Sequence, residues 1–302
     1  MAPRSVLSQR PRMGTRNGPD NGRAGERNMP DGDIPAETSM IAGFEPRPNH
    51  VGSIHDDAAA RQYGYRSALV PGIILYGYMA NLVATGWGLD WIARGAMSSH
   101  SRRPVYEGDP IVIHARRGEA AAGPTVEMEI KDREGRVVAT GLATLPGAAP
   151  AMPDIAEFPV FPIETPLRFI AAGGFRQGDR FGSAEAVMTP EEHRESLEYF
   201  RQTWSGFIEH GVVHPTRLPH LVTHNALASY SLPTPSIFVT AATQHLGLVH
   251  VGDRLTTSGV ITAVYERKGN HYTDQSHLVI ANDITPVALV QRSSIYAARK
   301  EG

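Results

Sequence analysis

Two histidines and an aspartate lie close together in a polar loop and offer groups that can exchange protons. His50, His55 and Asp56 belong to the loop at residues 48–57. A histidine side chain titrates near neutral pH, so it can accept or donate a proton under ordinary conditions. We therefore expect His55 to be the main acid–base group, with His50 as a second one. Asp56 would orient His55 or supply a carboxylate, and Asp57 is the expected N-cap of a short helix.

A glycine at the start of a long apolar segment is the other group of chemical interest. Residues 68–84 carry no charge, and their apolar side chains recur mostly at spacings of three and four, which predicts a buried helix. Pro71 suits the first turn, and the N–H of Gly72 has no partner within the helix. Such an N–H favours negative charge that develops on a bound group. A core helix with a small residue at its start explains the same pattern.

The composition is that of an ordinary globular protein. The 302 residues are 41% hydrophobic and 20% charged, with a formal net charge of −2 and no cysteine. So small a net charge gives no sign of a nucleic-acid or membrane-surface partner, and no apolar run is long enough to span a bilayer. The lack of cysteine excludes disulfides, thiolate metal sites and a cysteine nucleophile, and it fits a cytoplasmic protein.

The N-terminal segment differs from the rest of the chain. Residues 1–36 scatter arginines among Gly, Pro, Asn and Ser, with little to bury, which predicts a disordered leader. A start site assigned too early, with Met29 or Met40 as the later candidate, explains it equally well. The remaining chain is expected to form a unit at 37–147, a Pro-rich linker at 148–166 and a second unit at 167–302.

The two units share a pattern at a nearly constant offset, which indicates an internal duplication. Val70-Pro71-Gly72 corresponds to Val213-His214-Pro215, 143 residues later, and Gly108-Asp109 corresponds to Gly252-Asp253, 144 residues later. Helices are expected near residues 71–86 and 214–230. Strands are expected at residues 111–115, 125–130, 136–145, 236–242, 254–264, 273–280 and 286–296. A sheet can bury a helix by wrapping around it, so we expect an α+β fold in which one continuous antiparallel sheet carries both helices side by side on its concave face.

This organisation resembles the double hot-dog proteins of the MaoC-like hydratase/dehydratase family over about residues 40–300. The loop containing His55, the short helix after it and Leu69-Val-Pro-Gly72 are similar to the family's D-x-N-P-x-H motif, short helix and V-H-G helix start. Members with the complete motif hydrate trans-2-enoyl thioesters with (R) specificity. The resemblance implies that an Asp and a His activate one water molecule while the helix-start Gly N–H binds the thioester oxygen.

Residue by residue, the motif His corresponds to His55, the helix-start Gly to Gly72 and the motif Asp to His50. The resemblance thus implies an acyl-thioester hydratase or dehydratase of CoA or carrier-bound substrates, without a cofactor, forming a possible homodimer. Its expected site residues are His55, His50, Asp56 and Gly72. Because the carboxylate is missing at position 50, a hot-dog thioesterase and a non-enzymatic acyl-thioester-binding protein remain alternatives.

Two further clusters allow a binding role. His210, His214, His220 and His224 surround the start of the second helix, where they could hold a metal ion, form a polar pocket wall or pack as ordinary core residues. We expect no metal site, because the cluster lacks cysteine and an H-E-x-x-H motif. The pairs Arg267 with Lys268, or Arg61 with Arg66, could meet the phosphates of coenzyme A or simply occupy solvated turns.

Overall fold

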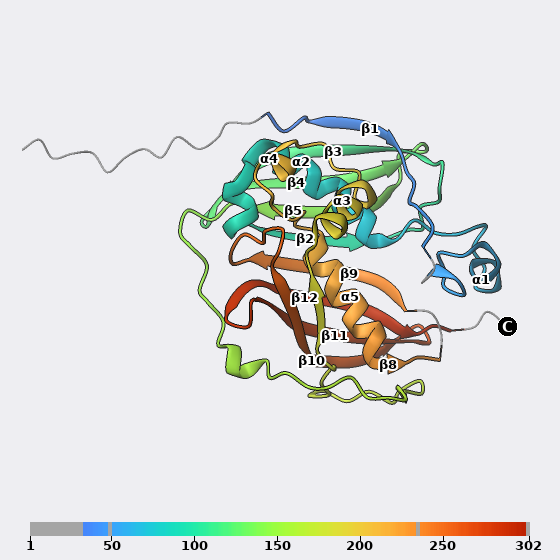
Figure 1. Cartoon of the computed structure of the whole chain (residues 1–302). Helices are drawn as coiled ribbons and strands as arrows, with labels where there is room; N and C mark the ends of the chain where they lie inside the picture. The colour runs from blue at the N-terminus through green and yellow to red at the C-terminus, as the bar shows by residue number, and fades with distance from the viewer. Residues whose placement is uncertain (1–32, 48–49, 234–235, 300–302) are drawn as a thin grey trace, which may run out of the picture.

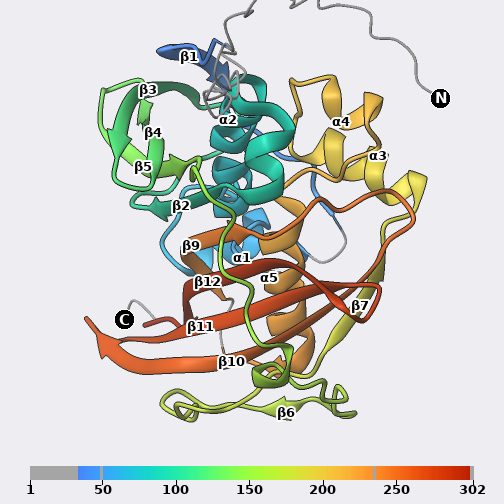
Figure 2. The ribbon, with the colours of Figure 1, turned by 90° about the vertical axis from the view of Figure 1, so that its left-hand side faces the viewer.

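A single large antiparallel sheet forms the framework of the molecule. The computed structural model describes residues 33–47, 50–233 and 236–299; residues 1–32, most of the predicted leader, lie outside the described residues. The ten strands follow the order β1-β3-β4-β5-β2-β9-β12-β11-β10-β7, and both long helices lie on the same side of them (Figures 1 and 2). The predicted α+β architecture with one continuous sheet is confirmed.

Each half of the chain contributes one long helix and one part of the sheet. The elements of the first half are β1 (Glu37–Ile41), α1 (Asp57–Gln62), α2 (Gly72–Arg94), β2 (Ala96–Ser101), β3 (Pro110–Ala120), β4 (Gly123–Asp132) and β5 (Val137–Thr144). Those that follow are a 3-10 turn (Ile155–Glu157), β6 (Arg168–Phe169), β7 (Ala184–Val187), α3 (Pro190–Tyr199), α4 (Gly206–Glu209), α5 (Arg217–Ser229), β8 (Tyr230–Ser231), β9 (Ile237–His245), β10 (Arg254–Arg267), β11 (Asn270–Ala281) and β12 (Thr285–Ala297).

Helix α2 is buried almost all round, as its uncharged sequence predicts. It packs on β2, β4, β5 and β9, and Ile74, Met79 and Val83 are fully buried. The helix extends to Arg94, beyond the expected end near residue 86. Gly88 has a left-handed backbone (φ 55°), and the helical path continues on both sides of it. Glycine adopts this conformation without the steric penalty of a side chain, so the helix bends there instead of ending.

The internal duplication is visible in the backbone pairing at the two helix starts. Leu69 pairs with Tyr106 in the first half, and Val212 pairs with His250 in the second half. The Gly-Asp turn is also repeated, because Asp109 accepts a hydrogen bond from the Tyr106 N–H and Asp253 accepts one from the His250 N–H. These pairings repeat at the 143- and 144-residue offsets of the sequence.

The arrangement of the two long helices differs from the expected side-by-side packing. Phe200, directly after α3, packs on Gly77 of α2 and stacks on His214, so it lies between the two helices. The halves are joined here by hydrogen bonds. The His214 Nε2–H donates to Asn81 Oδ1 at 2.9 Å, and Asn81 Nδ2 donates to the carbonyl oxygens of Phe200 and Arg201.

Two strands of the first half were not expected from the sequence, and one of them joins the halves. Strand β2 pairs with β5 on one side and with β9 on the other. Its sequence Ala-Met-Ser-Ser-His-Ser is mostly small and polar, so it lacks the alternation that marks a strand. Strand β1 was missed because its sequence, Glu-Thr-Ser-Met-Ile, is short and half exposed at the edge of the sheet.

Candidate active site

His55 is held by the backbone in a single tautomer. The Nδ1 atom of its ring lies 2.8 Å from the carbonyl oxygen of Leu69, and its backbone N–H donates to Ser53 Oγ. A carbonyl oxygen can only accept a hydrogen bond, so Nδ1 carries the proton and Nε2 has a free lone pair. Burial lowers the pKa of His55, and the Leu69 carbonyl offsets part of this effect. The ring is therefore neutral at pH 7, with Nε2 available to accept a proton.

His50 is held in the opposite tautomer. The N–H of Arg47 donates to His50 Nδ1 at 3.2 Å, so in the neutral ring the proton is on Nε2. Burial is the main cause that lowers the pKa of His50 to about 4, and repulsion from a protonated His55 and from Arg47 adds to it. The His50 and His55 ring centroids are 5.4 Å apart, and both rings pack against Phe44. One neutral ring can thus accept a hydrogen bond where its neighbour donates one.

Gly72 is the first residue of α2 and has a free N–H. Pro71 is the N-cap, and no described residue accepts a hydrogen bond from the Gly72 N–H. A Cβ at this position would lie 2.6 Å from the Phe238 ring and 2.9 Å from Ser101 Oγ. Close packing therefore requires glycine here. The exposed N–H and the aligned peptides of the long helix favour negative charge next to it.

Asp56 and Asp57 have structural roles that differ from those expected. Asp56, not Asp57, is the N-cap of α1, since its Oδ1 accepts from the N–H groups of Ala58 and Ala59. No hydrogen bond joins it to His55 in the described part of the chain, and the Leu69 carbonyl orients that ring instead. Asp57 accepts from the Ala68 N–H and pairs with Arg61. Neither carboxylate lines the cavity next to His55.

His50, His55 and Gly72 line a cavity of about 440 Å³ between the two halves. Helix α5 supplies the opposite wall with His220, Thr223, His224 and Leu227. The His220 and His224 rings are 4.2 Å apart, and Tyr199 stacks on His220. Burial is the main cause that lowers the pKa of His224 to about 4 and that of His220 well below its usual range.

The metal hypothesis for the histidine cluster finds no support in this geometry. His214 is fully buried, and both of its ring nitrogens are engaged, because Nε2 donates to Asn81 and Nδ1 accepts from the Thr216 N–H. Within the described ranges, no three His, Cys, Asp or Glu side chains converge as a metal site would require. His220 and His224 form a polar pocket wall instead.

A second hollow, of about 550 Å³, adjoins the first at His55, Gly72 and Phe238. Arg102, Arg103 and Arg267 line it together with several aromatic rings. The other arginines considered for phosphate binding are engaged elsewhere, because Arg61 pairs with Asp57 and Arg66 pairs with Asp109. A bound molecule that passes His55 can therefore place one end in each hollow. The end in the second hollow would lie among the arginines that line it.

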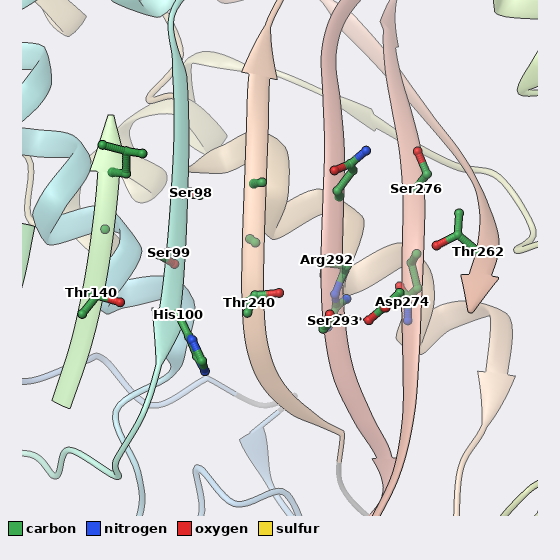
Figure 3. Close-up of a pocket in the computed structure, with 16 residues that line it drawn as sticks. Ser98, Ser99, His100, Thr140, Thr240, Thr262, Asp274, Ser276, Arg292 and Ser293 are labelled. Atoms are coloured by element: carbon green, nitrogen blue, oxygen red, sulfur yellow. Dashed lines mark hydrogen bonds between the residues drawn. The ribbon is translucent and has the colours of Figure 1, made fainter. Parts of the chain in front are cut away.

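A third hollow, of about 610 Å³, lies on the sheet face that points away from the helices (Figure 3). Its labelled side chains come from neighbouring strands and include Ser98, His100, Thr240, Asp274 and Ser293. None of the expected site residues lines it. It shares Arg292 with the cavity next to His55, and it shares His100, Thr240 and Ser293 with the second hollow.

Arg292, Tyr199 and Phe238 line the cavity but were not expected from the sequence. For Tyr199 and Phe238 the sequence offers no signal, because an aromatic residue in a helix or strand is normally part of the core. For Arg292 the sequence does contain a signal. Arg292 lies on the same inward face of its strand as Val290 and Ser294, where a charged side chain is unusual.

No protein-family model matches the chain, and no curated protein sequence matches it either. Solved structures do resemble it. A protein described as a MaoC domain dehydratase from Chloroflexus aurantiacus has a TM-score of 0.58 at 13% identity, covering 88% of this chain and 96% of its own. A MaoC-like dehydratase has a TM-score of 0.56 at 14% identity, covering 87% and 98%.

A conserved hypothetical protein of Mycobacterium tuberculosis, described as having a double hotdog fold, has a TM-score of 0.55 at 15% identity and covers 86% of this chain and 95% of its own. At such identities the likeness defines the fold, so this chain has the double hot-dog fold of MaoC-like dehydratases. Among the described residues, none of the helices has the length and apolar character needed to cross a bilayer.

Proposed function

We propose that this protein is an acyl-thioester hydratase or dehydratase acting on 2-enoyl or 3-hydroxyacyl thioesters. The observation that carries the proposal is the pair of opposite tautomers of His55 and His50 on one cavity wall, beside the free N–H of Gly72. Hydration needs a base for water, a donor that holds this water and a dipole for the enolate oxygen. These three groups supply all three requirements without a carboxylate.

The reaction follows from these roles. His55 Nε2 takes a proton from water as the water oxygen bonds to Cβ, while the His50 Nε2–H donates a hydrogen bond to that oxygen. The electron pair of the Cα–Cβ double bond moves toward the thioester carbonyl, and the Gly72 N–H stabilises the oxygen. The enolate then collapses, and Cα takes the proton back from His55. Dehydration is the reverse sequence.

The second hollow suits the carrier end of the thioester. Arg102, Arg103 and Arg267 line it, and it meets the cavity at His55 and Gly72. Guanidinium groups bind phosphate oxygens in paired hydrogen bonds, so these arginines would hold the phosphates of coenzyme A or of a carrier's prosthetic arm. The acyl group would then extend into the cavity beside α5.

The test is an assay of enoyl thioester loss, run beside an assay of free thiol. Short trans-2-enoyl-CoA esters, both neutral and carboxylated, are incubated with the full-length protein. Loss of the conjugated enoyl absorbance without thiol release supports the hydratase. Thiol release would identify a thioesterase instead, and tight binding without either reaction would identify a non-enzymatic acyl-thioester-binding protein.

A further inference from the structure

Arg292 carries a buried positive charge that the rest of the chain leaves without a counter-charge. Its side chain is 4% exposed, and no described residue accepts a hydrogen bond from its guanidinium, whose Nε and Nη1 are both buried. Burial alone lowers the pKa of Arg292, to about 10. The group therefore remains charged at any physiological pH.

An unpaired buried charge is costly, so its presence needs an explanation. Arg217 offers a comparison within the same half. It is also buried, but its guanidinium bonds to Glu192 at 2.9 Å and to His220. The fold thus compensates one buried arginine with its own carboxylate and leaves the other without one. A ligand that binds at Arg292 could supply the missing charge.

Arg292 lines the cavity that also contains His55 and Gly72. The neighbouring inward residue of β12, Ser294, pairs with Phe238, whose ring packs against Gly72. Arg292 is two residues from Ser294, a rise of about 7 Å along the strand. Arg292 is therefore one inward position along β12 from the residue that pairs with Phe238 at the helix start, a spacing that a short acyl chain can bridge.

The rest of the cavity wall favours a negative ligand as well. The described residues that line it include four histidines and Arg292 but no Asp or Glu. An entering carboxylate would thus meet no like charge there. The nearby Arg47 and Arg217 add to the positive potential that acts on His220 and His224.

We propose that the acyl group of the substrate carries a second carboxylate, which binds Arg292. The substrate class is then the monothioester of a short unsaturated or hydroxylated dicarboxylic acid. This inference rests on the proposed function, because it places the thioester at Gly72 and the distal carboxylate at the guanidinium. A planar guanidinium can hold a carboxylate through two parallel hydrogen bonds, whereas a methyl group in the same place leaves the charge unpaired.

The experiment compares esters that differ only at the far end of the acyl chain. Binding of glutaryl-CoA and pentanoyl-CoA is measured by calorimetry, and hydration is measured with trans-glutaconyl-CoA and trans-2-pentenoyl-CoA. The wild type should favour the carboxylated member by about 100-fold in both measurements, the usual scale of a charge-assisted contact with a buried ion. R292M should abolish this preference.

Two further variants control the result. R254M removes an exposed arginine, paired with Asp283 and Glu185, that does not line the cavity, and it should keep the wild-type preference. Without ligand, R292M should have a higher Tm than the wild type, because it removes an uncompensated buried charge. If R292M does not fold, the carboxylate assignment is still tested by R292K and by the wild-type preference between the two esters of each pair.

The possible failures can be told apart. Equal binding and equal hydration of the two esters in a pair overturn the carboxylate assignment and leave the proposed hydratase in place. An Arg292-dependent preference for glutaryl-CoA without any hydration supports the anion site and overturns the hydratase. If neither ester binds, both proposals are wrong.

Discussion

The two nitrogens of His55 have different surroundings, and the proposed role of the residue depends on this difference. The Leu69 carbonyl fixes the proton on Nδ1, so Nε2 keeps a free lone pair. His50 has the opposite arrangement, because the Arg47 N–H occupies its Nδ1. The sequence identified both histidines as candidates. It could not indicate their tautomers, since these depend on backbone groups that the fold brings into contact.

His55→Ala should lower kcat by about 10²–10⁴-fold, the usual contribution of a general base. Binding of an acyl-CoA should change little, because the carrier and the distal end of the acyl group have other contacts. His114→Ala is the matched control, since His114 lies half exposed on β3 and pairs with Glu37. Steady-state kinetics on an enoyl-CoA checks this, and full activity in His55→Ala would show that another group is the base.

The pH dependence of kcat/KM also tests the proposed role of His55. A base must be neutral to act, and burial lowers the pKa of His55 below its usual value near 6.5. The plot of kcat/KM should consequently stay level as the pH falls through 6.5 and decline only at lower pH, within the range where circular dichroism shows a folded protein. A decline centred at or above pH 6.5 would contradict this assignment.

His50→Ala should separate a two-histidine site from a single base. If His50 holds the water, its loss should lower kcat by about 10-fold or more, the energy of one hydrogen bond of about 1.4 kcal/mol. Restoring a donor with His50→Gln should recover part of the rate. Wild-type turnover in His50→Ala would leave His55 as the only acid–base group, and the missing family carboxylate would then have no replacement at position 50.

Helix α2 shows how far sequence patterns lead at the scale of an element. Its apolar periodicity predicts a buried helix, and the start near Pro71 is right within one residue. The end is wrong, because Gly88 bends the helix without stopping it. Strand β2 is not predicted because its sequence is polar, yet it lies at the centre of the sheet where the halves meet. Position in the sheet, not residue preference, makes it a strand.

Gly72→Ala should destabilise the protein by about 1–3 kcal/mol, because the new methyl group would overlap the Phe238 ring and Ser101 Oγ. Urea denaturation measures this. Gly147→Ala is the control, since a Cβ there meets nothing within 4 Å, and it should stay within about 0.5 kcal/mol of the wild type. If Phe238→Ala does not relieve the defect of Gly72→Ala, overlap with the Phe238 ring is not its cause.

Several histidines are buried in the described structure, among them His214, His245 and His277. Burial is the main cause that lowers the pKa of His214 and His277 to about 3 and that of His245 to about 4. In the unfolded chain these groups bind protons near pH 6.5, while in the folded protein they do not. The unfolded state therefore gains protons first as the pH falls, and the free energy of unfolding must fall with it.

We expect stability to be at its full value above pH 6.5 and to be lost progressively toward pH 3, where His214 and His277 also bind protons in the folded protein. Each such histidine removes up to about 1.4 kcal/mol per pH unit in this window. Chemical denaturation at several pH values checks the slope. His245→Leu should reduce this slope by the contribution of one histidine. Both nitrogens of the His245 ring lack a partner in the described structure, so the substitution removes no hydrogen bond seen there. A slope unchanged by this substitution would mean that other groups cause the acid sensitivity.

The repeated helix start has a consequence for stoichiometry. Where the first half has Gly72 with a free N–H, the second half has Pro215, which has none to offer. His214 before it is fully buried between Phe200 and Phe207 and is bonded to Asn81. If Gly72 binds the thioester oxygen as proposed, the second copy has no equivalent donor at this position. A titration with a tight acyl-CoA analogue should thus end at one equivalent per chain, with no cooperativity between the halves.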